Sequence, residues 1–346
     1  MSHSRVGVRH VCVEDNEVAE DEVFLAERFE ADRAHLRAVA YRMLGSLSEA
    51  DDAVQEAWLR LSGSDTRKVE NLTGWLTTVV GRVCLDMLRT RRSRREDPLD
   101  VYVPDPIVSG TEGADPEHEA LLADSVGLAL LVVLEALPPA ERLAFVLHDM
   151  FGMPFDEIAP IVDRTPAAAR QLASRGRRRV RGTGSEPAQA PESDPARGRE
   201  VVDAFLAASR GGDFEGLLAL LDPDVVLRVD VGGPTGDAPA GDAAGVGAPA
   251  AGAWASKVVR GARAVSEQAL TFRRLAQVTR PVLVNGAPGL VAVDAQQRPL
   301  SLAAFVVRDG KITEIDILAD PARLSRLDLT GLRTTGPGTT GLGTVT

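Results

Sequence analysis

The sequence predicts two all-α helical domains followed by an α+β domain, and three observations support this prediction. Apolar residues recur at spacings of three, four and seven from residue 24 to about 92, and again from about 121 to 181. From about residue 221 onward the period shortens to two, which is typical of β-strands. Stretches rich in Pro, Gly, Ser and acidic residues separate the blocks, as linkers do.

These breaks place the domain boundaries. We expect a first helical domain at 21–95, a second at 121–181 and the α+β domain at 199–329. The other segments are a flexible N-terminal tail at 1–20, linkers at 96–120 and 182–198, and a low-complexity tail at 330–346.

Composition narrows the class of protein. The 346 residues carry a formal net charge of -11, which argues against a protein that coats nucleic acid nonspecifically but allows a local basic face. Cys12 and Cys84 are too few for a disulfide framework or a zinc site, so a reduced, cytoplasmic setting is the simpler interpretation. No secretory signal is visible, and the apolar run at 126–134 is too short to span a membrane. We expect a soluble protein without metal or cofactor.

The first helical domain reads as three helices. Gly45 stops the first, and Ser48 is the expected N-cap of the second, with Asp51 three residues later. The third runs from about Leu72 to Arg92. Apolar positions on the inward faces are Leu25, Phe29, Leu36, Val39, Ala40, Met43, Val54, Ala57, Trp58, Leu61, Leu76, Val79, Val80, Val83 and Met87.

The second helical domain ends in a basic helix. Thr165 is a plausible N-cap and Pro166 takes the first helical position. The residues expected to face inward are Ala169, Leu172, Ala173 and Val180. The outward face then holds Arg170, Gln171, Ser174, Arg175, Arg177, Arg178 and Arg181. A short helix, a tight turn and a basic helix form the helix-turn-helix plan, whose second helix reads the major groove of DNA. A solvated basic helix or a partner-binding helix is the alternative.

A second basic cluster lies at the end of the third helix of the first domain. Its members are Arg82, Arg89, Arg91, Arg92, Arg94 and Arg95. Cations at a helix C-terminus are ordinary, but Trp75, Thr77 and Thr78 near the start of the same helix suit unstacked bases. The period of Trp75 fits a buried packing residue equally well.

The third block changes character. Helices at about 199–210, 213–221 and 262–275 accompany five stretches of strand-like alternation, and Asp309-Gly310 indicates a hairpin. The Ala-, Gly- and Pro-rich insertion before residue 254 is expected to be a disordered loop.

Taken together, the helical blocks resemble a sigma factor of the extracytoplasmic-function type, a group within the sigma-70 family. AYRMLGSLSEADDAVQEAWLRL and NLTGWLTTVVGRVCLDMLRTRR resemble region 2 of that family, and LPPAERLAFVLHDMFGMPFDEIAPIVDRTPAAARQLASRGRRRVR resembles region 4, a helix-turn-helix. The resemblance covers about residues 21–181. It implies that the chain binds the clamp and flap of core RNA polymerase and promoter DNA.

The resemblance also implies roles for individual residues. Polymerase contacts would be Asp51, Asp52, Gln55, Glu56 and Trp58. The −10 element would be read by Lys68, Asn71, Trp75, Thr78, Arg82 and Arg89. The −35 duplex would face Arg170, Gln171, Ser174, Arg175 and Arg178.

The third block resembles a SnoaL-like domain, a cone-shaped α+β fold, which a subgroup of these sigma factors carries at its C-terminus in place of a separate anti-sigma factor. The family signatures W-L-P-E-P, D-G-G-G-K and N-P-D-K-L correspond to residues 102–106, 230–234 and 320–324. The regulatory interdomain contacts that this implies are made by Pro104, Asp105, Pro106, Asp320, Pro321 and Leu324. The sign of the control is left open, and so is a small-molecule ligand in the cone.

Two other functions compete with this interpretation. A one-component DNA-binding regulator with a sensing domain would have no use for the −10 helix. An isomerase or cyclase would need a positioned base, but the third block holds no His, Tyr or Cys, which leaves Asp230, Asp294 and Asp316 as candidates. Asp294 fits a hairpin turn better than a catalytic role. We therefore expect no catalytic residue.

Overall fold

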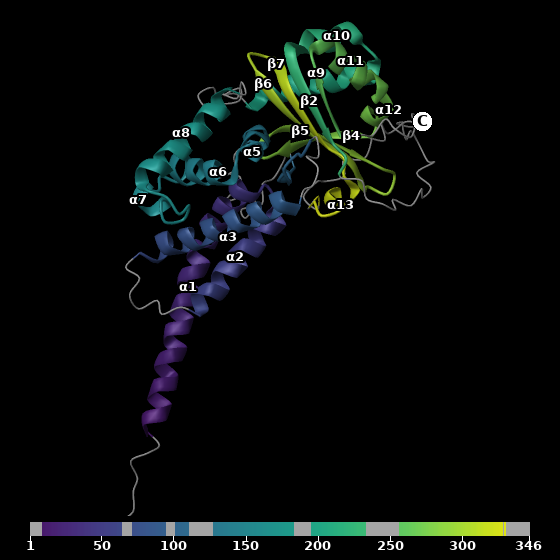
Figure 1. Ribbon diagram of the computed structural model, residues 1–346. Coiled ribbons are helices and arrows are strands. Elements are labelled where there is room, and N and C mark those ends of the chain that lie inside the picture. The colour runs from purple at the N-terminus through teal and green to yellow at the C-terminus, as the bar shows by residue number, and fades with distance from the viewer. Residues whose placement is uncertain are drawn as a thin grey trace, which may run out of the picture. The chain divides into compact units, whose positions relative to one another are not determined.

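A computed structural model of the protein describes residues 9–63, 71–94, 101–110, 127–182, 195–232, 256–327 and 329. They form two compact units (Figure 1). Unit 1 comprises described residues within Met1–Pro98 and Leu130–Pro187, and unit 2 those within Leu99–Ala129 and Ala188–Thr346. The chain thus leaves unit 1, contributes the segment between its two halves to unit 2, and returns.

The first half of unit 1 is three packed helices, α1 (Arg9–Leu44), α2 (Leu47–Ser62) and α3 (Leu72–Arg94). Gly45 ends α1 with a φ of 69°, a conformation that favours glycine. The prediction of a loose tail over 1–20 differs from the structure, because α1 begins at Arg9. No Gly or Pro interrupts residues 8–44, so a helix nucleated by its packed C-terminal half can extend backward.

The cap of α2 also differs from the prediction. Ser46, rather than Ser48, is the N-cap, and its hydroxyl accepts a hydrogen bond from the Glu49 backbone N–H at 3.5 Å. Ser46 and Glu49 stand at the spacing of a capping box, the sequence pattern that identifies this start. Ser48 lies in the first turn, where its hydroxyl is 3.1 Å from that of Ser46.

The second half of unit 1 is a series of short helices that leads to one long helix. These are α5 (Leu128–Glu135), α6 (Pro139–Phe145), the π-helical turn η2 (Val146–Met150), α7 (Phe155–Ile158) and α8 (Pro166–Gly182). The expected continuous helix through residue 151 is therefore divided at Phe145. The predicted boundary near residue 121 lies outside the described residues.

The two halves of unit 1 pack against each other. The backbone of Gly81 on α3 approaches Leu147 and Ile161 closely enough that an added Cβ would lie 3.5 and 3.8 Å from their methyl groups. Arg142 on α6 is buried, donates to Glu135 and reaches the Arg42 carbonyl oxygen at 3.3 Å. Glu135 also accepts from Arg91 on α3 at 3.1 Å, and Arg91 in turn pairs with Glu49. This ion network ties helices α2 and α3 to α5 and α6.

Unit 2 is a mixed sheet with helices packed against it. The helices are α9 (Pro195–Gly211), α10 (Phe214–Leu220), α11 (Ala262–Thr271), α12 (Arg273–Ala276) and α13 (Pro321–Leu324). The strands are β1 (Val108–Ser109), β2 (Leu221–Asp230), β3 (Lys257–Arg260), β4 (Thr279–Val284), β5 (Ala287–Val293), β6 (Pro299–Arg308) and β7 (Lys311–Leu318).

The strand order is β1-β4-β5-β6-β7-β2-β3, and only β2 and β7 pair in parallel among the described strands. Alternation along the strands sends one set of apolar side chains, including Leu227, Phe305 and Ile315, into a core shared with α9, α10 and α11. Asn285-Gly286 and Asp309-Gly310 close the hairpins with positive φ at both residues, so the predicted hairpin at 309–310 is confirmed.

Two of the strands, β1 and β3, were not predicted from the sequence. β3 is four residues long, and β1 lies in the segment expected to be a linker, where Val108 and Ser109 pair with Val284 and Leu283 of β4. Within the described residues, no helix is both long and apolar enough to cross a membrane.

Candidate nucleic-acid interface and linker anchor

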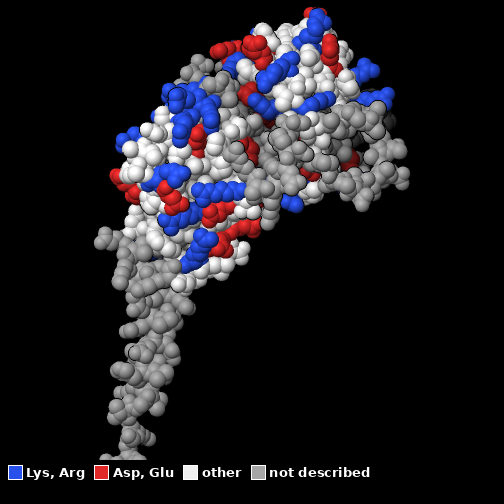
Figure 2. Space-filling model, in the orientation of Figure 1, with Lys and Arg blue, Asp and Glu red and all other residues white. Residues whose placement is uncertain are grey.

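The face pattern of α8 matches its sequence periodicity. Ala169, Ala173 and Val180 are buried and Leu172 is half-buried, whereas the polar positions point outward. Thr165 accepts a hydrogen bond from the Ala168 N–H at 3.3 Å, as an N-cap does. The predicted −35 residues Arg170, Gln171, Ser174, Arg175 and Arg178 are all exposed. Figure 2 shows basic side chains gathered over this helix.

The six arginines of α8 serve two purposes. Arg175 and Arg179 pair with Glu141 on α6, and Arg177 pairs with Asp149 of η2, so these three attach the helix to its support. Arg170, Arg178 and Arg181 remain exposed on the outer face. The Arg170 guanidinium lies 5.2 Å from the Phe155 ring, which holds it at the start of the helix.

Gly176 explains how α8 comes so close to α6. A Cβ at this position would lie 3.1 Å from the Glu141 carbonyl oxygen and 3.1 Å from the Phe145 Cβ. Glycine inside a helix costs about 1 kcal/mol relative to alanine, but here it permits backbone contact between the two helices.

The predicted −10 residues lie along α3, except Lys68, which is outside the described residues. Asn71 caps the helix by accepting from the Gly74 N–H at 3.0 Å, and Thr78 donates to the Gly74 carbonyl oxygen at 2.9 Å. Trp75 is half-buried and exposed Arg89 lies 3.6 Å from Asp86. Arg82 is exposed and donates to the Pro160 carbonyl oxygen at 3.2 Å.

The predicted polymerase contacts lie on α2. Asp51, Asp52 and Gln55 are exposed, and Asp51 forms an ion pair with Arg37 at 2.7 Å. Glu56 is half-buried and pairs with Arg60 at 3.1 Å. Trp58 is half-buried with its ring 5.0 Å from that of Phe29, so its indole serves packing as well as the surface.

In unit 2, Arg323 on α13 brings three separate segments together. Its guanidinium donates to Asp105 at 2.6 Å, to Asp230 at 2.8 Å and to the Val103 carbonyl oxygen. Asp230 is 3% exposed and also accepts from the backbone N–H groups of Val103 and Gly232. This linker anchor, defined as Asp105, Asp230 and Arg323, fixes residues 101–109 to the cone, together with β1.

The other predicted interdomain residues support this anchor. Asp320 caps α13 by accepting from Ala322 at 2.9 Å, Pro321 takes the first helical position and Leu324 is buried. Pro104 and Pro106 are buried, whereas Asp105 is half-buried. The signature Asp-Pro-Ala-Arg-Leu pointed to its outer residues and not to Arg323. The two other signatures each contain an acid, Asp105 and Asp230. These two acids are the sequence feature that could have indicated a cation between them, which is Arg323.

Comparison with known proteins identifies the family. The family Sigma-70 region 2 matches residues 29–94, and the family Sigma-70, region 4 matches residues 127–180. ECF RNA polymerase sigma factor SigJ of Mycobacterium tuberculosis (strain ATCC 25618 / H37Rv) is 38% identical over 308 residues, which cover 86% of this chain and 92% of that protein. This chain belongs to the ECF RNA polymerase sigma factors.

Two further comparisons agree with this assignment. The probable ECF RNA polymerase sigma factor SigI of the same strain is 34% identical over 298 residues, 86% of this chain and 93% of that protein. The crystal structure of Mycobacterium tuberculosis extracytoplasmic function sigma factor SigJ superposes with a TM-score of 0.66 at 35% identity, and covers 88% of this chain and 99% of that chain. The predicted family, the helical sigma domains and the C-terminal SnoaL-like α+β domain are thereby confirmed.

The acids that were candidates for catalysis in the SnoaL-like domain have structural partners. Asp294 closes a turn by accepting hydrogen bonds from the backbone N–H groups of Gln296 and Arg298. Burial alone would raise the pKa of Asp294, but these hydrogen bonds and the charge of Arg298 have the larger combined effect, so the pKa is lowered. Asp316 pairs with Arg228 at 3.0 Å, and Asp230 belongs to the linker anchor. Among the described residues, no group of three or more His, Cys, Asp or Glu side chains could hold a metal ion.

Proposed function

We propose that this chain binds core RNA polymerase, recognises the −35 and −10 elements of a promoter and initiates transcription. The observation that carries the proposal is the outer face of α8, where Arg170, Gln171, Ser174 and Arg178 are exposed on a helix attached by its inner face and by ion pairs to α6. Arg reads guanine and Gln reads adenine in the major groove, and neighbouring arginines bind phosphates. The relatives SigJ and SigI are named as RNA polymerase sigma factors, which supports the same function.

Polymerase docking is assigned to α2. Asp51, Asp52 and Gln55 present an exposed acidic and polar surface, bordered by Glu56 and Trp58. The opposite side of the helix, with Val54, Ala57 and Leu61, is buried against α1 and α3. A rigid helix with one exposed polar side suits docking to the polymerase clamp, and region 4 would bind the flap.

Recognition of the −10 element is assigned to Lys68, to the N-cap residue Asn71 and to Trp75, Thr78, Arg82 and Arg89 along α3. Half-buried Trp75 is partly accessible to an unstacked base, and the arginines offer charge for phosphates. Because Arg82 donates to the Pro160 carbonyl oxygen, promoter binding would exchange this internal hydrogen bond for a contact with DNA.

Control by the C-terminal domain is assigned to the linker anchor. The segment that connects regions 2 and 4 is built into the sheet through β1 and bound by Arg323. A change in the cone that releases Arg323 or β1 would therefore lengthen the free chain between the two regions. Such control acts in cis, so a separate anti-sigma factor is not required. In this proposal the protein performs no catalysis itself and acts in the cytoplasm, together with the polymerase.

The experiment combines binding and transcription with the full chain. Gln171→Ala with Arg178→Ala should leave the affinity for core polymerase unchanged and reduce specific transcripts at least about tenfold, because each lost base contact is worth about 1–3 kcal/mol. Arg274→Ala, an exposed arginine of α12, is the control and should transcribe normally. A chain that binds duplex DNA but not core polymerase would instead be a one-component regulator.

A second experiment tests cis control. Replacing Asp320, Pro321 and Leu324 together should alter transcription while polymerase binding persists, because the anchor of the linker loosens. The single variant Asp105→Asn should act in the same direction with a smaller effect. Transcription equal to the parent in both variants would refute control through the linker anchor.

A further inference from the structure

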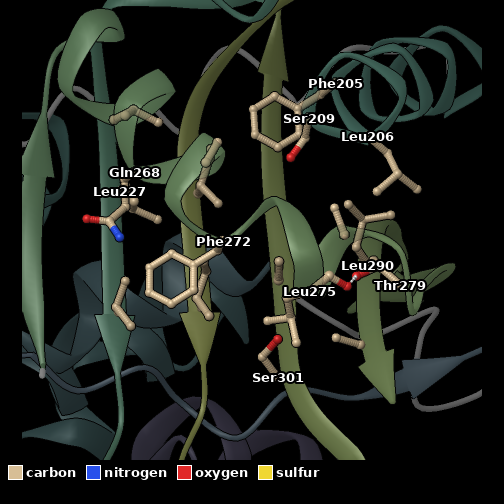
Figure 3. A pocket seen from close by; sticks show the side chains of 18 of the residues that line it. Phe205, Leu206, Ser209, Leu227, Gln268, Phe272, Leu275, Thr279, Leu290 and Ser301 are labelled. Carbon is tan, nitrogen blue, oxygen red and sulfur yellow. Dashed lines mark hydrogen bonds between the residues drawn. The ribbon is translucent and has the colours of Figure 1, made fainter. Parts of the chain in front are cut away.

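The cone of unit 2 contains a partly open cavity to which the proposed promoter function assigns no role. Its volume is about 130 Å³, and it lies between the inner face of the sheet and helices α9, α11 and α12 (Figure 3). The rings of Phe205, Phe272 and Phe305 and the side chains of Leu227, Leu290 and Ile315 form much of the wall. Phe205 and Phe305 meet edge to face at 5.5 Å.

The size and lining of the cavity indicate a small apolar guest. An apolar protein cavity of about 150 Å³ accommodates benzene. The space in this cone is of similar size, which suits one aromatic ring or a short hydrocarbon chain. An aromatic guest would also meet ring edges and faces, which prefer one another over aliphatic contacts.

One positive charge faces this apolar space. Lys257 of β3 lines the cavity, and its Nζ donates to the Gln268 Oε1 at 2.9 Å and lies 5.9 Å from the Phe272 ring centroid. Neither contact neutralises the ammonium, and within the described part of the chain it forms no ion pair with a carboxylate. Its two remaining N–H groups, with the Nε2 of Gln268, form a set of donors suited to an anion.

Two hydroxyl groups line the cavity from other elements. Ser209 of α9 and Ser301 of β6 are 5% and 8% exposed, and their hydroxyls have no hydrogen-bond partner among the described residues. In Figure 3 the side chains of Ser209, Gln268 and Ser301 approach the space from three different elements. Both residues line the cavity, so their hydroxyls are placed to bond with a guest.

We propose that this cavity binds a small apolar carboxylic acid, either a single-ring aromatic acid or a short-chain aliphatic one. The carboxylate pairs with Lys257 and the Gln268 amide, and the apolar body lies among Phe205, Phe272 and Phe305. Ser209 and Ser301 bind a hydroxyl or keto substituent. Among the described lining residues, Lys257 is the one group that could transfer a proton, and it is assigned to pairing with the carboxylate, so the cavity is assigned to binding rather than turnover.

The test is direct binding to the full chain and needs no transcription, so its result is independent of the promoter function. Benzoate, phenylacetate and octanoate are the acid probes, and benzyl alcohol and toluene are their neutral counterparts, each measured by calorimetry and by ligand-detected NMR. The acids should bind more tightly than the neutral compounds. Lys257→Met should weaken the acids about ten- to a hundredfold and leave the neutral probes unchanged, since only a charge-assisted bond is lost.

Two variants complete the design. Arg260→Met removes an exposed cation from the same strand outside the cavity and should bind every probe like the parent. Ala303→Phe fills the cavity and should abolish binding of acids and neutral probes alike, with an unchanged circular dichroism spectrum to verify folding. Equal affinity of acids in the parent and in Lys257→Met, or no binding of any probe at millimolar concentration, would overturn the proposal.

Discussion

Buried Arg142 in unit 1 and half-buried Arg323 in unit 2 both join segments far apart in sequence, but their surroundings differ. Arg323 donates to two carboxylates and a carbonyl oxygen, and its guanidinium lies 4.6 Å from the Tyr102 ring. Arg142 donates to Glu135 and to the Arg42 carbonyl oxygen, while its Nη2 is buried without a partner among the described residues.

This difference shows that an arginine can join distant segments without adding much to the free energy of unfolding. The attraction within a buried ion pair offsets the desolvation penalty only when the geometry is good and the remaining polar atoms have hydrogen-bond partners. By that criterion the linker anchor should stabilise strongly, because one guanidinium pairs with both Asp105 and Asp230 and also reaches a carbonyl oxygen. Arg142 should contribute little net stability, because Glu135 keeps Arg91 as a partner when Arg142 is lost.

The largest expected effect follows removal of Arg323. Arg323→Met takes this shared cation away from Asp105 and Asp230, which costs about 3 kcal/mol, the lower end of the usual range, because Asp230 keeps two backbone donors. Amide exchange over residues 101–110 should therefore accelerate about a hundredfold. Arg326→Met, an exposed arginine three residues later, is the control. Exchange at the parental rate in Arg323→Met would show that β1 and the backbone contact with Asp230 hold the linker without Arg323.

A third arginine sharpens the comparison, because Arg228 shares one Nη1 between Glu314 at 2.9 Å and Asp316 at 3.0 Å. Burial raises the pKa of Asp316 to about 6, Arg228 opposes this rise and Glu314 adds to it. The folded state therefore holds the proton more tightly than the unfolded state does. The stability from this proton is present below pH about 4 and is lost as the pH rises through about 6.

We expect the free energy of unfolding of unit 2 to lose about 2 kcal/mol from this group between pH 4.5 and 7. Urea unfolding of the full chain at a series of pH values measures the loss. Asp316→Asn cannot titrate, so the difference between parent and variant isolates the contribution of this carboxyl. Parallel pH profiles for the two proteins would contradict the raised pKa.

The matched substitution in unit 1 is Arg142→Met, and its effect should be smaller. The methionine fills the space without an unsatisfied Nη2, while Glu135 retains its 3.1 Å pair with Arg91, so we expect a loss of about 1 kcal/mol or less. Urea midpoints of unit 1 in parent and variant measure it. A loss as large as that of Arg323→Met would show that the two sites are energetically equivalent.

Sequence patterns were most informative where periodicity decides the structure. The two faces of α8 and the inward residues of α3 followed from helical spacing, because burial of an amphipathic face needs only local order. The signatures around residues 104, 230 and 320 indicated which segments matter, but their convergence on Arg323 depends on the tertiary fold. β1 was missed because two residues have no period, and its strand pairing comes from β4 far along the chain.

Gly176 is another position where the tertiary fold, and not the local sequence, decides the effect of a residue. Its substitution is also the prediction with the smallest expected effect. By helix propensity alone, Gly176→Ala should stabilise α8 by about 1 kcal/mol. The added Cβ, however, would lie 3.1 Å from a carbonyl oxygen of α6, which no change of rotamer can relieve, and overpacking of this kind costs about 1–3 kcal/mol.

We therefore expect Gly176→Ala to lower the free energy of unfolding of unit 1 by about 1 kcal/mol, measured by urea denaturation. Ser174→Ala, an exposed position two residues earlier, gains propensity without a new contact and should be neutral or slightly stabilising. Because a shift of α8 also moves Arg175 and Arg179 away from Glu141, the variant should lose part of the ion pairs that hold the helix. A stabilised Gly176→Ala variant would mean that α6 yields to the methyl group, and that those ion pairs rather than close backbone contact position the basic face.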